Sequence, residues 1–166
     1  KQSTAMLADV VVNDHWYTEY TPSTVEGIPS ESIGNTLMTR QLSRDDTRHR
    51  LELIGPAKFS QDGKSVKYVV KVSNETAQFF SSRGLPDGSM GIFLGCHAVG
   101  KNGEVMDFKG PKSAIPFILS PNESMYLAIE IELKKLPSRA AFIDIEMFQE
   151  GANWWGNPLR VPLDHC

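Results

Sequence analysis

Two adjacent tryptophans, Trp154 and Trp155, stand between Gly151 and Gly156 and are the side chains best suited to ligand chemistry. Neighbouring residues of an extended chain point in opposite directions, so at most one of the two rings is expected to face a core. The other ring would be exposed, and a sugar can stack its apolar C–H face on such a ring when carboxylates and amides surround it. The alternative is that both rings only close the end of the fold, and the sequence leaves both interpretations open.

Four carboxylates occupy alternate positions of two segments that precede the tryptophans: Glu130, Glu132, Asp144 and Glu146. If the two segments pair, these groups form an acidic patch interleaved with Tyr126, Phe142 and Phe148. Two carboxylates at i and i+2 of one strand face lie roughly 7 Å apart at their Cα atoms, which suits the acid–base pair of a glycosidase. Charged residues at such positions more often form only the solvated side of a strand. A glycan-cleaving enzyme acting through Asp144 and Glu146 is therefore the less favoured interpretation.

The other reactive side chains give weaker signals. Neither His49 nor His97 has a second histidine or cysteine at metal-ligand spacing, and the sequence has no nucleophile elbow, P-loop or dinucleotide fingerprint. We therefore expect no catalytic residue, no metal and no cofactor. Several basic side chains can meet an acidic sugar or a neighbouring domain, or simply be solvated: Arg40, Arg44, Arg48, Arg50, Lys109 and Lys112.

The segments that carry the aromatic and acidic residues have the alternation of strands. Apolar side chains occupy every second position over 125–133 and again over 141–147, and a period of two is typical of a half-buried strand in an antiparallel sheet. Pro137 and Ser138 between the two segments indicate a turn. Further strands are predicted at 5–12, 48–54, 66–72, 90–99, 104–108 and 115–119, with a long loop over 21–36.

About eight or nine short strands, with no helix of convincing length, predict an all-β fold, an antiparallel β-sandwich of the jelly-roll or immunoglobulin-like kind. The 166 residues are expected to form one domain over 1–166, and the lysine at position 1 suggests the C-terminal part of a longer protein. A net charge of −3 without a basic stripe argues against nucleic acid as a partner. No apolar run approaches the ~18 residues of a membrane span, so direct membrane insertion is not expected. Cys96 lies in an apolar run and is predicted to be buried, whereas Cys166 ends the chain.

Roughly the second half of the chain carries a series of motifs in a fixed order. GEV at 103–105 and Lys112 come first, followed by SPNES at 120–124, the two alternating strands, FQEG at 148–151, WW at 154–155 and PLRVP at 158–162. This order resembles the C-terminal carbohydrate-binding domain of Wzt-type ATP-binding subunits of O-antigen polysaccharide ABC transporters. The sequence departs from that family at Asn122, where glycine is usual, and at 138–140, where a glycine turn before a tyrosine is usual.

The resemblance implies a non-catalytic domain on the cytoplasmic face of the bacterial inner membrane. Such a domain recognises an O-antigen polysaccharide, at its non-reducing terminus, for export by the transporter. Its implied partners are the O-polysaccharide, the ATPase and membrane subunits, and a second copy in a homodimer. Two rival interpretations are a glycan-holding sandwich appended to a glycosyltransferase or methyltransferase, and a structural or dimerising sandwich without a ligand.

The residues and the resemblance together define a candidate carbohydrate-binding site on a sheet face or in a groove at the strand ends. Its predicted members are Trp155, Trp154, Phe148, Glu146, Asp144, Tyr126, His97 and Lys112. We expect Trp155, Phe148, Glu146 and Tyr126 to form its centre.

Overall fold

The computed structural model describes residues 37–163. These residues belong to the second of two units, Lys1–Asn35 and Thr36–Cys166, into which the chain divides. The predicted strand at 5–12, the predicted loop at 21–36 and Cys166 lie outside the described residues, and the single domain over 1–166 stays a prediction. Within 37–163 no helix is long and apolar enough to cross a membrane.

The first sheet is built on β3 (Ser65–Asn74), which lies between β6 (Ser124–Glu132) on one side and β1 (His49–Leu53) and β2 (Lys58–Phe59) on the other. All of these pairs are antiparallel. β1 and β2 follow one another along the same edge of β3, separated by Gly55 and Pro56. Gly55 has φ of 69°, a left-handed conformation that glycine adopts without steric cost, and this turn interrupts the edge.

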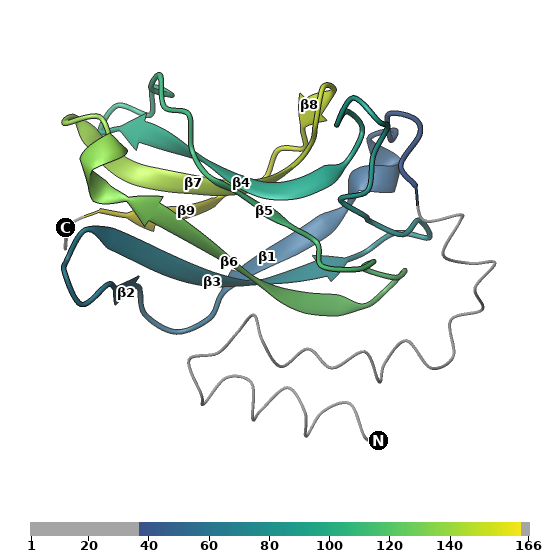
Figure 1. Cartoon of the computed structure of the whole chain (residues 1–166), viewed down its shortest axis with the longest axis horizontal. Coiled ribbons are helices and arrows are strands. Elements are labelled where there is room, and N and C mark those ends of the chain that lie inside the picture. Colours follow the sequence, from purple (N-terminus) through teal and green to yellow (C-terminus); the bar gives the residue numbers. More distant parts are fainter. Residues whose placement is uncertain (1–36, 164–166) are drawn as a thin grey trace. The chain divides into compact units, whose positions relative to one another are not determined.

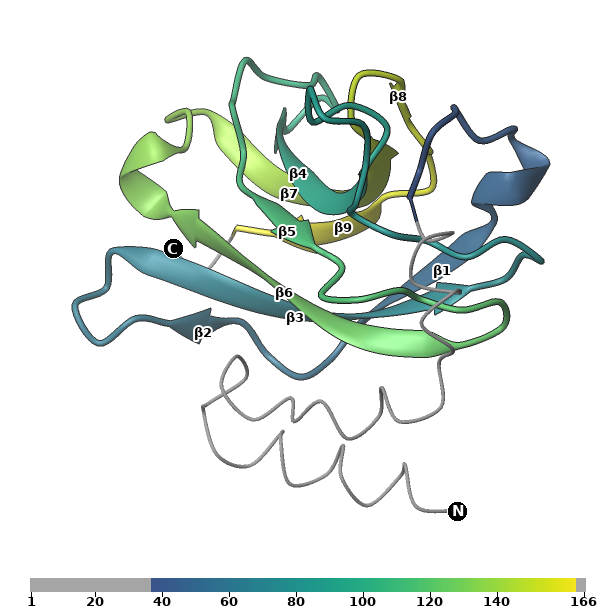
Figure 2. The same ribbon diagram turned by 45° about the vertical axis from the view of Figure 1, so that its right-hand side comes forward.

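The second sheet is built in the same way on β7 (Ala140–Gln149), which pairs with β4 (Ile92–Gly100) on one side. On its other side lie β8 (Asn153–Trp154) and β9 (Leu159–Pro162), again two short strands along one edge. β5 (Lys112–Ala114) pairs with the far side of β4, and all pairs are antiparallel. The two sheets form two facing layers (Figures 1 and 2), so the predicted all-β sandwich is confirmed.

The core lies between the two sheets and uses every second residue of the long strands. The alternation read from the sequence therefore identifies the inward side chains correctly. Fully buried members are Val66, Val70 and Val72 of β3, Ile129 and Ile131 of β6, Leu94 and Ala98 of β4, and Ile143, Ile145 and Met147 of β7. Burying one such larger side chain stabilises the fold by roughly 1.5–3 kcal/mol, so these strands are the main source of its stability. Cys96 is part of this core, and burial raises the pKa of its thiol to about 12.

The two clearest predicted strands do not pair with each other. β6 pairs with β3 and β7 pairs with β4, so the chain passes from one sheet to the other through the 3₁₀ helix η3 (Leu133–Lys135). Each strand gains a long antiparallel partner in this way, while its apolar side faces the opposite sheet. The acidic patch expected from pairing of these strands is therefore not formed, because Glu130 and Glu132 lie in one sheet and Asp144 and Glu146 in the other.

Two of the smaller predicted strands are wrong. The segments 104–108 and 115–119 contribute only single bridges, Val99 with Val105 and Phe80 with Leu119, and the strand in this part of the chain is β5. Pro116 lacks the backbone N–H that a continuing ladder needs. The pairing of β4 with β7 also shifts register between Val99 and Gly100, just before the 104–108 segment.

Asn74 ties together the loops at one end of the first sheet. Its side-chain Nδ2 donates to the carbonyls of Gln78, Leu119 and Ser120 at 2.7, 3.1 and 3.2 Å. Its Oδ1 accepts from the backbone N–H and the hydroxyl of Thr76 at 3.0 and 2.8 Å. Asn74 is 1% exposed, so the Asn-Glu-Thr sequence that it begins is a structural motif and not a place for a glycan.

A second asparagine, Asn122, occupies a turn with φ of 60°. This left-handed conformation is the one that glycine adopts most readily, and asparagine is among the few other residues that tolerate it. The departure from glycine noted at this position in the sequence therefore preserves the backbone shape of the turn.

Replacing Asn74 by alanine is expected to lower the free energy of unfolding by about 2–4 kcal/mol, because several buried carbonyls and the Thr76 N–H lose their partner together. Urea unfolding followed by circular dichroism measures the change. Asn102→Ala, in an exposed turn, is the matched control and should change stability by less than about 0.5 kcal/mol. Equal effects of the two substitutions would contradict the assigned role of Asn74.

Candidate functional site

The two tryptophans of the sequence motif point in opposite directions, as the alternation of an extended chain requires. Trp155 packs against the core, with ring centroids 4.9 Å from Phe80 and 5.5 Å from His49. Trp154 turns to the other side of the sheet and is 39% exposed. The expectation that at most one ring faces the core is met. Trp155, which was predicted at the centre of the site, packs against the core, and Trp154 is the outward ring.

Glu146 fixes this arrangement at the break between β8 and β9. Its carboxylate accepts the backbone N–H of Gly156, and the N–H of Trp155 still donates to the carbonyl of Met147 at 3.0 Å. Gly156 and Asn157 have φ of 82° and 59°, so the chain can turn sharply here before β9 begins. Glu146 is only 7% exposed, although it lies on the outer side of β7.

Aromatic rings cover the outer side of β4 and β7 on both sides of Gly95. The Phe148 ring stacks on Phe93 at 5.7 Å and on Trp154 at 4.5 Å, and Trp154 lies 3.8 Å from the His97 ring, measured between ring centroids. A Cβ at Gly95 would lie 2.8 Å from Phe148 Cε1 and 2.9 Å from Trp154 Cη2. Glycine at this position therefore lets the two rings settle against the strand backbone.

Charged groups flank the rings and are paired with one another. Both oxygens of Asp144 accept from the Arg160 guanidinium at 2.7 Å, and Asp144 itself is 6% exposed. At the other side of the rings, Lys112 Nζ lies 2.5 Å from a Glu150 oxygen and 4.5 Å from the centroid of the Phe93 ring. The bidentate contact with Asp144 raises the pKa of Arg160 further, so this guanidinium is always charged.

We call this surface of the five-stranded sheet the outer face. It consists of Phe93, Gly95, His97, Lys112, Asp144, Glu146, Phe148, Trp154 and Arg160, and in Figure 1 the curved strands β4 and β7 carry most of it, with β8 at one end. The strand register places these residues in neighbouring rows. Phe93 is opposite Phe148, Gly95 is opposite Glu146, and His97 is opposite Asp144.

Six of the eight predicted site residues lie on the outer face: Trp154, Phe148, Glu146, Asp144, His97 and Lys112. Trp155 faces the core, and Tyr126 lies on β6 in the other sheet, opposite Lys71 of β3. Tyr126 was grouped with the others only because β6 and β7 were expected to pair. The structure separates them into different layers.

Three residues of the outer face were not predicted from the sequence: Phe93, Gly95 and Arg160. Phe93 and Gly95 lie two and four positions before His97 on β4 and therefore on the same side of the strand, so the alternation identifies them once that strand is assigned. Arg160 lies opposite Asp144 on β9, and only the strand register reveals this pairing. A short last strand of four residues carries too little pattern to fix its register.

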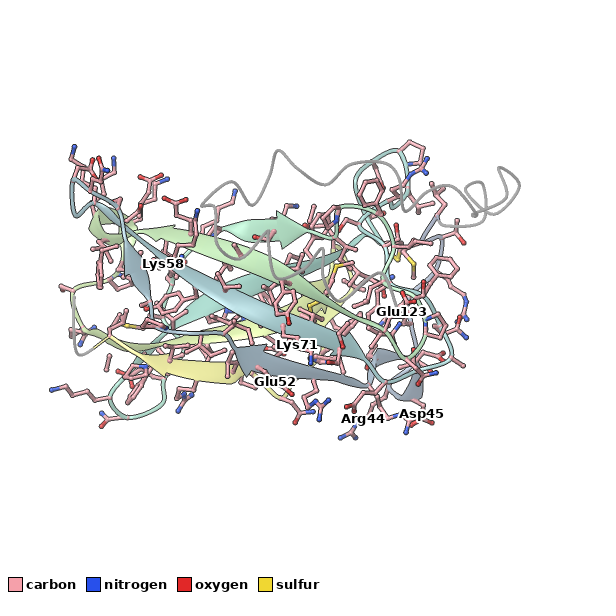
Figure 3. The ribbon with its side chains drawn as sticks, turned by 90° about the horizontal axis from the view of Figure 1, so that it is seen from below. Arg44, Asp45, Glu52, Lys58, Lys71 and Glu123 are labelled. Carbon is pink, nitrogen blue, oxygen red and sulfur yellow. The ribbon has the colours of Figure 1, made fainter. Side chains whose placement is uncertain are left out.

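The outer surface of the four-stranded sheet has a different character. Figure 3 shows this side, with the cross-strand neighbours Glu52 and Lys71 near its middle and with Arg44 and Asp45 at the start of the 3₁₀ helix η2 (Asp45–Thr47), which precedes β1. Arg50, from the basic cluster noted in the sequence, lies 3.1 Å from Glu52 and 3.7 Å from Glu75. The basic residues here alternate with acids, as expected for a solvated face.

His49 lies behind the outer face, on the core side of Trp155. Its Nδ1 is 2.7 Å from the Thr47 carbonyl, and Nε2 is a buried atom without a hydrogen-bond partner, as is Nε1 of Trp155. Burial lowers the pKa of His49, against the raising effects of the Thr47 carbonyl and of Glu146 and Glu75. The ring is therefore neutral at neutral pH and serves as packing for Trp155.

Comparisons with known proteins add little to this geometry. No protein-family model matches the sequence, and no curated protein matches it. β-Glucosidase 3B from Thermotoga neapolitana, solved in complex with α-D-glucose, aligns with 69% of this chain and 17% of its own length at 14% identity and a TM-score of 0.34. A β-glucosidase from Kluyveromyces marxianus aligns with 69% of this chain and 14% of its own at 16% identity and a TM-score of 0.34. Likenesses this distant carry no argument about function.

Replacing Gly95 by alanine is expected to displace the Trp154 and Phe148 rings, because the added methyl group would overlap both. The near-ultraviolet circular dichroism of the aromatic groups should change, while the far-ultraviolet spectrum of the strands should not. The same substitution in a Trp154→Ala background is the control and should cause a smaller change. An unchanged near-ultraviolet spectrum for Gly95→Ala would contradict the packing of the rings over this glycine.

Proposed function

We propose that this chain is a non-catalytic carbohydrate-binding domain that holds a polysaccharide on the outer face of the five-stranded sheet. The observation that carries the proposal is the run of rings Phe93, Phe148 and Trp154, which lies between the pairs Asp144–Arg160 and Lys112–Glu150. A pyranose ring has apolar C–H groups that can stack on the aromatic rings and hydroxyl groups that can form hydrogen bonds with the charged pairs. Both kinds of group lie on one surface.

The charged pairs support this function because they are fixed before any ligand arrives. Arg160 uses its Nε and Nη2 to hold Asp144, which leaves further N–H donors, and each Asp144 oxygen retains a lone pair. Donors and acceptors whose positions are already set lose little conformational entropy when a hydroxyl group binds. A sugar can therefore be oriented by groups that need no rearrangement.

The same contacts favour binding over hydrolysis. A glycosidase needs one carboxylic acid that gives up a proton to the leaving group and a second carboxylate that acts as nucleophile or base. Both oxygens of Asp144 are held by Arg160, and Glu146 holds the Gly156 N–H. Both carboxylates are therefore already engaged, Asp144 with β9 and Glu146 with the turn that follows β8.

The identity of the polysaccharide is proposed from the sequence motifs. Their order between 103 and 162 resembles the carbohydrate-binding domains of Wzt-type transporter subunits, and the WW motif supplies Trp154 to the outer face. We therefore propose O-antigen polysaccharide, bound at its non-reducing terminus, as the ligand. The proposed partners are the ATPase and membrane subunits of an ABC transporter and a second copy of the chain, at the cytoplasmic face of the bacterial inner membrane.

Titration of the protein with delipidated bacterial O-polysaccharides of different terminal structure, followed by calorimetry, tests the proposal. Binding is expected for one terminus and not for the same repeat without it. Trp154→Ala should weaken that binding at least tenfold, equal to about 1.4 kcal/mol, because the exposed ring of the outer face is removed. Tyr126→Ala, on the other sheet, is the matched control and should leave the affinity unchanged.

No binding to any polysaccharide by a folded sample would overturn the proposal in favour of a structural or dimerising sandwich. Binding that survives Trp154→Ala and is lost in Tyr126→Ala would place the site on the four-stranded sheet and contradict its assignment to the outer face.

A further inference from the structure

We propose that a pocket beside Trp154 is a second sugar subsite, continuous with the outer face, that takes one neutral pyranose unit of the bound chain. This inference rests on the proposed function and adds a second binding position for the glycan, in a pocket formed mainly by loop and turn residues. The pocket has a volume of about 490 Å³ and is lined by residues 41–44, Thr47 and 153–156. Trp154 belongs to both surfaces, so a glycan on the outer face can extend into the pocket without leaving this ring.

The wall made by residues 41–44 is held in place from far along the chain. Gln149, which is 1% exposed, accepts the N–H of Leu42 at 2.9 Å and donates to the carbonyls of Arg40 and Met90 at 2.9 and 2.8 Å. The side chain of Leu42 is buried in the core as well. This segment is therefore a fixed wall, although it has no regular secondary structure.

The opposite wall is the turn that follows β8, and it is fixed by different contacts. Glu146 holds the N–H of Gly156, and the Trp155 ring packs between Phe80 and His49. Both walls are thus anchored to β7, one through Gln149 at its end and one through Glu146. A pocket whose walls are fixed in advance can bind a small ligand without first ordering a loop.

The lining has the chemistry of a sugar site. The side-chain amides of Gln41 and Asn153 meet at 3.5 Å, and amides both donate to and accept from hydroxyl groups. Thr47 and Ser43 add hydroxyls, and Trp154 adds an apolar ring. Arg44 is the one charged residue among the described residues of the lining, and the 3₁₀ turn that follows it begins with two acids, Asp45 and Asp46, of which Asp46 accepts the hydroxyl of the lining residue Ser43 at 2.8 Å. We therefore infer a neutral sugar and not a uronic acid.

Nuclear magnetic resonance of the full chain, labelled with ¹⁵N, tests the subsite directly. The probes are the methyl glycosides of D-mannose, D-glucose, L-rhamnose and N-acetyl-D-glucosamine, with D-glucuronic acid as the acidic comparison, all at millimolar concentrations. At least one neutral glycoside should shift the side-chain amide signals of Gln41 and Asn153 together with the indole N–H of Trp154. D-Glucuronic acid should shift them less.

Gln41→Trp fills the pocket from its exposed wall and should abolish the shift at Asn153 while leaving shifts at Gly95 and Phe93 of the outer face. Gln61→Trp, in an exposed turn, is the matched control and should change neither set. Shifts at the outer face alone, equal in both variants, would overturn the subsite and leave the proposed function standing. No shift at either place with any probe would count against both, and a response to D-glucuronic acid alone would overturn the inference of a neutral sugar.

Discussion

The geometry of the outer face depends on a single contact, the acceptance of the Gly156 N–H by the side chain of Glu146. Along β7, the edge formed by β8 and β9 is interrupted opposite this residue. A side-chain oxygen takes the place of the missing backbone partner, so a partly buried N–H is satisfied although the ladder is broken. The break lets the chain turn with Trp155 in the core and Trp154 on the outer face. If β8 and β9 formed one continuous edge strand, the turn that forms one wall of the pocket would not exist.

The charges on the outer face follow from the same constraint. Asp144 and Glu146 are almost as buried as core residues, yet they lie on the side of the sheet that does not face the core. Carboxylates removed from water are tolerated only with strong partners, and here these are Arg160 and the Gly156 N–H. Such pairs add little to stability compared with apolar packing, because desolvation offsets the attraction. Their main effect is to fix the positions of donors and acceptors beside the rings.

Features that depend on the residues within a single strand could be predicted from the sequence. The alternation of apolar side chains located β1, β3, β4, β6 and β7 and the inward residues of the long strands, because burial on one side of a sheet imposes a period of two. It also showed that Trp154 and Trp155 point apart. It did not show which ring faces the core, because that depends on which side of β8 meets the other sheet.

The sequence also did not predict which strands pair with each other. Tyr126 was placed beside Phe148, and Arg160 was not recognised beside Asp144, since pairing between distant strands leaves no mark on either strand alone.

The most direct test of the account uses a protein in which Trp154 is the only tryptophan, made by Trp16→Phe and Trp155→Phe. Its fluorescence is followed while the O-polysaccharide that binds in calorimetry is added. The emission of Trp154 should change, and acrylamide should quench it less, once the glycan is bound, with the same dissociation constant as calorimetry gives. Unchanged emission and quenching at saturating glycan would contradict the account, because the polysaccharide would then bind away from the outer face.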